Sequence, residues 1–168
     1  MKKNFDNLFT EEIMGQAEVF PIISLDENPT EINISSGEEV PILPLRNMVI
    51  FPGVLMPVTV ARPKSLKLIR KTQENDGIIG VCTQTDKKIE DPTLDDLYNI
   101  GVVAKIVRIL EMPDNSTTVI LEGKKRFHLD ELVSEKPYLK AKIHPLEDKI
   151  PPKKDKQFTA LVSSIKDV

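Results

Sequence analysis

Cysteine and aromatic side chains are scarce in this sequence. It has one cysteine, Cys82, no tryptophan and two histidines among 168 residues. A single cysteine excludes an internal disulfide, and it leaves no cysteine set for a zinc or iron–sulfur site. Cys82 follows the apolar residues 78–81, so we expect it to be a small core residue and not a redox or catalytic one.

Glycine-rich phosphate loops and catalytic motifs are also missing. The seven glycines never take the spacing of a phosphate-binding loop followed by lysine and serine or threonine, so we expect no nucleotide site. His128 and His144 stand alone in strand-like segments, where a surface or core role is favoured over that of ligand or base. Adjacent acids such as Asp95 and Asp96 do not make an acid–base pair by themselves, and one of them is better explained as the cap of a short helical turn. The sequence therefore predicts a chain without catalytic residues, cofactor or metal.

Negative charge is concentrated at the N-terminus. Residues 1–39 hold nine acids against two lysines, a net charge of −7, although the whole chain carries only −3. The small overall charge does not favour a dedicated nucleic-acid binder. We expect residues 1–39 to form an acidic, partly disordered extension, and the alternative is a docking strip in which Phe20 and Ile22 engage a partner. Acids near the start interrupt any hydrophobic signal core, so we expect a cytoplasmic chain without a membrane span.

The sequence is rich in apolar residues over 40–63, but prolines break this segment. Pro44 and Pro57 each lack the amide that an internal helical turn needs, and each biases the residue before it toward extended geometry. The segment therefore predicts short strands over 40–45 and 54–60, joined through a Phe-Pro-Gly turn. Such a segment is too broken to span a membrane and has to pack into a β-rich core.

The rest of the chain alternates between helix and strand patterns. Helices are predicted from Arg62-Pro63 to a stop at 75–77, and over the apolar spacing at 158–165. Strands are predicted over 78–84, 102–112, 117–123, 125–132 and 138–146, with a loop at 85–92, a short turn at 95–101 and a hairpin turn at 113–116. The strand over 102–112 is apolar on both faces, which predicts a central place in the sheet.

Five segments, in order, resemble the N-terminal domain of ATP-dependent Lon proteases. They are PILPLRN and FPG within 41–53, RPKS at 62–65, DLYNIGVVA at 96–104, LEMPDNS at 110–116 and LEGKKRF at 121–127. No single motif is decisive, but five in the correct order are specific. The resemblance covers about residues 40–146, and the acidic extension has no counterpart in it.

The resemblance implies a fold and a setting. The fold is expected to be α+β and β-rich, a PUA-like pseudo-barrel with one or two packed helices, followed by the start of a C-terminal helical region. The implied divisions are the extension 1–39, the PUA-like β domain 40–147, and a linker with the start of a helical bundle over 148–168.

Family members recognise unfolded or damaged polypeptides and short-lived regulatory proteins, move them through a homohexameric ring that uses ATP and Mg, and cut them with a Ser–Lys dyad. The ATPase and protease motifs are absent from these 168 residues, so the fragment is expected to be non-catalytic. Alone, it is expected to be a monomer or weak dimer.

The expected function is therefore substrate recognition for a Lon protease. Such a module needs exposed apolar surface to hold unfolded chains. The candidate contact residues are the apolar ones around the Phe-Pro-Gly turn, Met48, Ile50, Phe51, Val54 and Met56. A plain core role is favoured for most of them.

Two other functions stay open at this point. One is a stand-alone Lon-like adaptor domain that binds proteins without a protease attached. The other is an RNA-binding module, because the implied barrel type also occurs in RNA-modifying enzymes and a basic run, 124–126, precedes Phe127. The low aromatic content does not favour the RNA-binding alternative for this domain.

Overall fold

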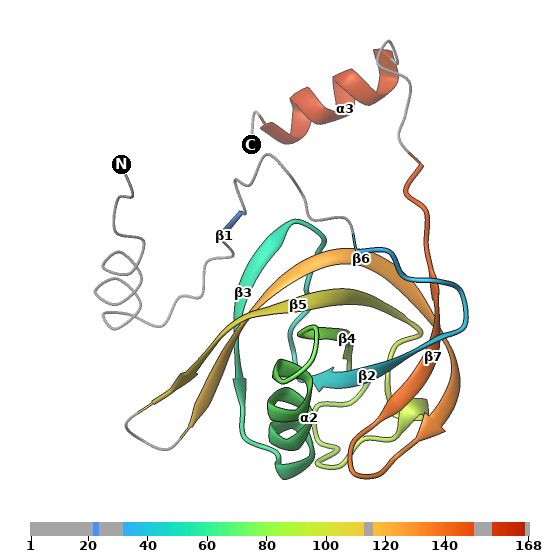
Figure 1. Ribbon diagram of the computed structural model, residues 1–168. Helices are drawn as coiled ribbons and strands as arrows, with labels where there is room; N and C mark the ends of the chain where they lie inside the picture. The colour runs from blue at the N-terminus through green and yellow to red at the C-terminus, as the bar shows by residue number, and fades with distance from the viewer. Residues whose placement is uncertain (1–21, 24–31, 113–115, 150–155, 167–168) are drawn as a thin grey trace.

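The computed structural model describes residues 22–23, 32–112, 116–149 and 156–166 (Figure 1). The strands are β1 (Ile22–Ile23), β2 (Glu38–Leu45), β3 (Val54–Val60), β4 (Ile78–Thr83), β5 (Ile100–Glu111), β6 (Thr117–Ser134) and β7 (Lys140–Pro145). The helices are α2 (Pro63–Gln73), α3 (Lys156–Lys166) and the 3-10 turn η1 (Leu94–Asp96). Most of the predicted extension 1–39 lies outside the described residues, as do the hairpin-turn residues 113–115.

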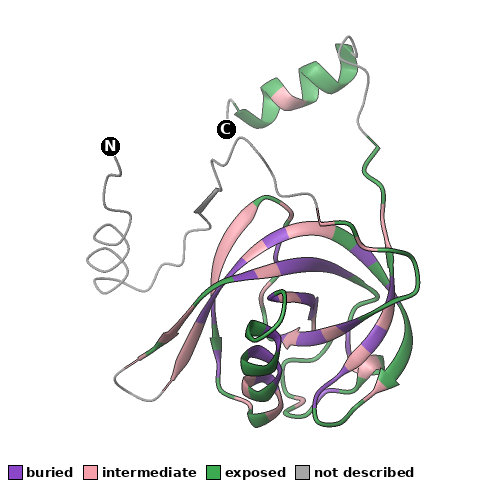
Figure 2. Cartoon of the chain, viewed as in Figure 1, coloured by how far each residue is buried: buried purple, intermediate pink, exposed green. Residues whose placement is uncertain are grey.

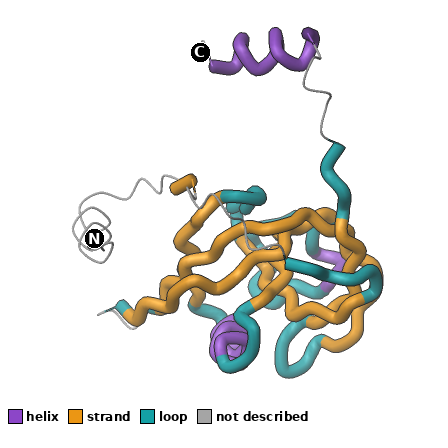
Figure 3. The backbone as a smooth tube through the Cα atoms, turned by 45° about the horizontal axis from the view of Figure 1, so that its top comes forward, coloured by secondary structure: helices purple, strands orange, loops and turns teal. Residues whose placement is uncertain are grey.

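The strands form one sheet that closes on itself. Its order is β1-β3-β6-β5-β4-β2-β7. β6 also pairs with β7, so the five strands β6, β5, β4, β2 and β7 form a closed ring. β3 and β1 extend the sheet beyond that ring, as the views in Figures 1 and 3 show. Among the described pairs only β2 and β4 run parallel. The predicted β-rich α+β pseudo-barrel is confirmed, although β3 and β1 lie outside the ring, so the sheet as a whole is not a regular barrel.

β6 is one strand where the sequence predicts two, over 117–123 and 125–132. That prediction is wrong, because the break expected between them is a bulge within a single 18-residue strand. Neighbouring residues of β5 pair with Gly123 and Lys125, which leaves Lys124 as an extra residue in the ladder. A bulge bends a strand and increases its twist without ending it.

Apolar side chains of the ring strands are buried in two clusters. Figure 2 colours long stretches of these strands as buried. One cluster draws on β2, β4, β5, β6 and β7, and its largest fully buried side chain is that of Phe127. Because all five ring strands contribute to it, this cluster fills the ring. The other cluster includes Leu68 and Ile69 of α2 and therefore lies between the outer face and the helix. β5 contributes to both clusters, as expected for a central strand.

The two main helices differ in how they pack. α2 starts with Pro63 at its first position, and it buries Leu68 and Ile69 at 1% exposure each. α3 has no buried residue, and its apolar residues Leu161 and Ile165 are 64% and 75% exposed. In Figure 2 α3 is accordingly coloured almost entirely as exposed. Of the one or two packed helices expected, α2 is the one that covers the sheet.

The folded region includes residues just before position 40. β2 begins at Glu38, and its first residues pair with β7. Ile32 and Ile34 are half-buried against the cluster inside the ring. The segment 32–39 therefore packs with the sheet although it belongs to the acidic part of the sequence.

A first prediction concerns Gly80, which sits where two strands approach closely. A Cβ added there would lie 2.6 Å from Cδ1 of Ile42 and 3.1 Å from Cζ of Phe127. We expect Gly80→Ala to lower the free energy of unfolding by about 1–3 kcal/mol through overpacking. Ile42→Val removes the colliding methyl group, so in the double variant it should recover part of that loss. Urea unfolding of both single variants and the double variant measures this coupling.

Gly101→Ala is the matched control for this experiment. A Cβ at Gly101 would lie 2.6 Å from the carbonyl oxygen of Val81, a backbone atom that a trimmed side chain does not move. Ile42→Val should therefore give no relief to Gly101→Ala. Strictly additive effects of Gly80→Ala and Ile42→Val would contradict the packing argument.

A second prediction concerns the single thiol. Cys82 is 1% exposed, which confirms the expected core position, and burial raises the pKa of its thiol to about 12. Because the thiolate is the reactive form, we expect no reaction with an aromatic disulfide reagent near pH 8 while the protein is folded. One thiol per chain should react after unfolding in urea. Thr59→Cys, at an exposed strand position, is a control that should react without unfolding.

Candidate functional site

The loop between β2 and β3, residues 46–53, is here called the apolar loop. Its Asn47 and Gly53 have positive φ angles of 51° and 77°. Left-handed backbone is most accessible to glycine and, among other residues, to asparagine. These two residues turn the chain at the start and the end of the loop, and the Phe-Pro-Gly turn predicted from the sequence lies at its end.

Two hydrogen bonds and one close approach hold the apolar loop on the sheet. The Thr83 hydroxyl donates to the carbonyl oxygen of Met48 at 2.6 Å, and the Gly53 N–H donates to the carbonyl oxygen of Gly123 at 2.8 Å. A Cβ on Gly123 would collide with the carbonyl oxygen of Phe51. The absence of a side chain at Gly123 therefore admits the loop to its position across β6.

The structure separates the five candidate residues of this region. Ile50 is 3% exposed and belongs to the core, so it anchors the loop and is not available for contact. Phe51 is 61% exposed. Met48, Val54 and Met56 are half-buried, and both methionines pack against the core. Only Phe51 thus presents most of its side chain outward, with three partly accessible apolar neighbours.

Sequence reasoning missed three exposed apolar residues near this loop, Val49, Tyr98 and Ile100, each more than half exposed. The Tyr98 N–H donates to the carbonyl oxygen of Thr83 at 3.0 Å, and the hydroxyl of the same Thr83 holds Met48. The apolar loop and the start of β5 therefore meet at Thr83. Tyr98 and Ile100 lie in a run that merges into a buried strand, so no periodic signal marks them as exposed.

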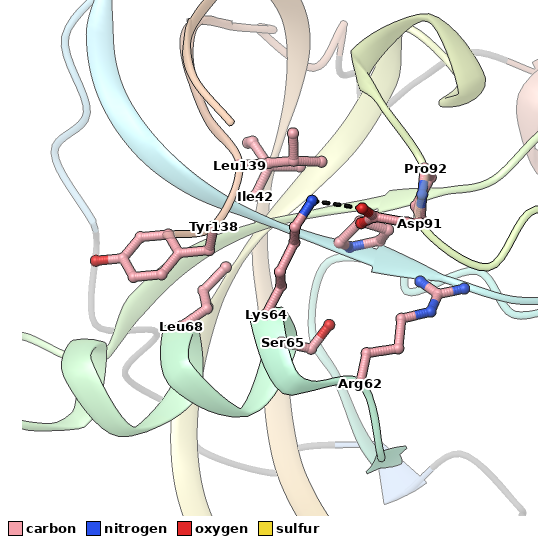
Figure 4. A pocket seen from close by; sticks show the side chains of 10 residues that line it. Ile42, Arg62, Lys64, Ser65, Leu68, Asp91, Pro92, Tyr138 and Leu139 are labelled. Carbon is pink, nitrogen blue, oxygen red and sulfur yellow. Dashed lines mark hydrogen bonds and ion pairs between the residues drawn. The ribbon is translucent and has the colours of Figure 1, made fainter. Parts of the chain in front are cut away.

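Neither of two hollows in the described surface resembles a small-molecule site. Figure 4 shows one beside the start of α2, where Nζ of Lys64 lies 2.6 Å from Oδ2 of Asp91. Its volume of about 20 Å³ suits little more than one water molecule. The other, about 450 Å³, is an open depression lined mainly by polar residues at the start of β2 and the end of α2. Ligand pockets of that size are normally concave and largely apolar.

The polar cluster next to the small hollow has a structural role. Gln84 is 4% exposed, and its Nε2 donates to the carbonyl oxygen of Ile89 at 2.9 Å. The guanidinium groups of Arg46 and Arg62 donate to the same oxygen at 3.3 and 3.4 Å. Burial, and then the charge of Arg46, lower the pKa of Arg62. This shared carbonyl ties the loop over 85–92 to the end of β2 and the start of α2.

The basic run at 124–126 is neutralised by nearby acids. The ion pairs are Lys124 with Glu122 at 2.5 Å, Lys125 with Glu147 at 2.7 Å, and Arg126 with Asp148 at 2.5 Å. Phe127 is fully buried and cannot stack on a base. Together with these acids the run carries no excess positive charge to attract a phosphate backbone, so this arrangement does not favour RNA.

The other polar candidates also have local roles. Nδ1 of His128 lies 3.1 Å from Asp130, and Nδ1 of His144 lies 2.6 Å from the hydroxyl of Ser36. The expected cap of a short helical turn is found, but its N-cap residue is Thr93 and not an aspartate. The N–H and hydroxyl of Thr93 donate to Oδ2 of Asp96, the last residue of η1. Within the described residues, no three histidine, cysteine or carboxylate side chains come together as a metal site. No helix in that part of the chain has the length and hydropathy of a membrane span.

Comparison with known proteins matches the chain to one family. Residues 39–168 match the model of the ATP-dependent protease La (LON) substrate-binding domain. The chain is 54% identical over 153 residues to the Lon protease of Parabacteroides distasonis, covering 89% of this chain and 19% of the relative. It is 44% identical over 163 residues to the Lon protease of Flavobacterium johnsoniae, covering 97% and 20%. The chain thus spans about a fifth of the length of these relatives.

Solved structures agree with the fold. The N-terminal domain of a Mycobacterium avium complex Lon protease superposes with a TM-score of 0.60 at 18% identity, covering 77% of this chain and 69% of that one. A Lon N-terminal domain protein from Xanthomonas campestris gives 0.56 at 19% identity, covering 77% and 74%. The resemblance seen in the sequence is confirmed, and the chain belongs to the family of Lon substrate-binding domains.

Proposed function

We propose that this chain is the part of an ATP-dependent Lon protease that recognises unfolded or damaged polypeptides, and that the apolar loop makes the contact. The main support is the exposed ring of Phe51 on a loop whose backbone is held in place. An unfolded substrate displays apolar side chains that a folded protein hides, so a fixed apolar projection distinguishes the two. Phe51 supplies the principal contact, and Met48, Val49, Val54 and Met56 supply its surroundings.

The way the loop is held supports this assignment. Thr83, Gly123 and the buried Ile50 fix its backbone, so little conformational entropy is lost when a substrate binds. The half-buried methionines have flexible, polarisable side chains that adapt to different apolar partners. A rigid ring beside adaptable thioethers suits a site that has to accept many sequences.

The rest of the proposed protein lies outside this chain. The parent is proposed to be a cytoplasmic serine endopeptidase, a homohexamer that uses ATP and Mg to move the substrate and a Ser–Lys dyad to cut it. The absence of phosphate-loop and nucleophile motifs from these 168 residues is consistent with a non-catalytic recognition role. The acids beside the basic run and the burial of Phe127 argue against the RNA-binding alternative.

The third prediction tests the loop. We expect Phe51→Asp to leave the fold intact, because the ring is 61% exposed, and to weaken binding of a chemically unfolded, fluorescein-labelled protein by about tenfold. Fluorescence anisotropy gives the affinity, and circular dichroism with urea unfolding checks the fold.

Two variants serve as controls for Phe51→Asp. Leu132→Asp places the same charge at another exposed apolar position, on the part of β6 that pairs with β7. It should bind the unfolded protein as tightly as the unmutated chain does. Ile50→Asp buries a charge and should unfold the domain. If Phe51→Asp binds the unfolded protein as tightly as the unmutated chain does, the loop is excluded as the contact surface.

The fourth prediction concerns the native polypeptide. An antibody raised to this chain should detect, in an immunoblot of the source cells, a band several times heavier than 18.9 kDa. A single band at that mass would instead indicate a free-standing adaptor domain. The blot thereby decides between the protease setting and the adaptor alternative.

A further inference from the structure

The outer edge of β3 has the properties of a strand-addition site. β6 pairs with β3 over residues 55–60 on one side. On the other side β1 pairs only with Val54 and Leu55, so within the described residues the edge over 56–60 has no partner strand. An open edge displays N–H and C=O groups that can pair with another extended chain.

The composition of β3 leaves this edge unprotected. Natural edge strands are usually guarded by charged side chains, yet Val54–Val60 contains none. Pro57, which lacks an N–H, is the one residue of the usual protective kind. Val58 and Val60 are buried and hold the strand on the core, while Thr59 is exposed. The edge is therefore firmly supported and uncharged.

The chain itself shows what kind of segment fits this edge. β1 is an Ile-Ile dipeptide in extended conformation, and it pairs antiparallel with β3, Ile22 opposite Leu55 and Ile23 opposite Val54. β3 also continues directly from the apolar loop, so an added strand at this edge lies within a few residues of Phe51. Of the docking strip considered from the sequence, Ile22 pairs with β3 of the same chain, and Phe20 lies outside the described residues.

We propose that the edge of β3 binds an extended apolar segment of the substrate by antiparallel strand addition, and that Ile22-Ile23 occupies the first positions of that edge until substrate displaces it. This inference rests on the proposed function and extends it from a contact residue to a binding mode. Main-chain hydrogen bonds give affinity without regard to sequence, and Phe51 favours apolar side chains. Ile22-Ile23 thereby competes with substrate for the same edge.

A reversible cross-link between β1 and β3 tests the inference. Residues directly opposite in an antiparallel pair have Cα atoms about 4.5–5.5 Å apart, within the range that a disulfide spans. Two double variants of the 168-residue chain are made, Ile22→Cys with Leu55→Cys and Ile23→Cys with Val54→Cys. Both are needed because the Cα–Cα distance alternates between adjacent antiparallel pairs. Cys82 does not interfere, since it is buried.

Binding is measured with a labelled nine-residue peptide of alternating valine and threonine, which forms an extended strand. Locking β1 onto β3 should weaken peptide binding by about tenfold or more, and reduction of the same sample should restore it. The controls are the variants with only one of the two introduced cysteines. Each should bind the peptide equally well when oxidised and when reduced. Conversely, Ile22→Pro with Ile23→Pro removes the N–H groups of β1 and should tighten peptide binding several-fold.

The outcomes separate this inference from the proposed function. If neither double variant cross-links, or if the cross-linked protein binds the peptide as well as the reduced one, strand addition at β3 is wrong. In that case the proposed function still holds if the unmutated chain binds unfolded protein and Phe51→Asp weakens that binding. If the unmutated chain binds neither the peptide nor unfolded protein, the proposed function fails and this inference fails with it.

Discussion

The bend in β6 is the constraint on which the rest of the structure depends. One strand pairs with β3 and β5 along its first part and with β5 and β7 along its second, and this double engagement closes the ring. A straight strand of that length would leave β7 without its second partner. The extra residue at Lys124 supplies local bending. Gly123, next to that bulge, opens the space into which the apolar loop fits.

The bulge in β6 also determines which apolar side chains the domain exposes. Because the loop docks against Gly123 and Thr83, its backbone is held while the Phe51 ring stays outside. Buried and exposed residues alternate along the loop, with Val49 and Phe51 exposed on either side of the buried Ile50. Anchoring and exposure are thus achieved by adjacent residues, which explains how a small domain keeps an apolar projection in water without losing its fold.

Most other conspicuous features serve the fold. The arginines at the ends of β2 and the start of α2 converge on one carbonyl oxygen, and the basic run on β6 is matched by acids. α3 differs, since its apolar residues are exposed in the part of the chain described. The functional interest therefore concentrates on the apolar loop and the adjoining edge of β3.

Local chemistry in the sequence determined much of this protein. Proline positions predicted β2 and β3, the Arg62-Pro63 start predicted α2, and turn residues predicted the hairpin of β5 and β6, because each depends on neighbours along the chain. Only the tertiary structure decided that β6 runs through Lys124, that Ile50 is inside while Phe51 is outside, and that Lys125 and Arg126 are paired with acids 22 residues away. Exposure and pairing arise from which distant segments meet across the fold, and a one-dimensional pattern of apolar residues does not contain that information.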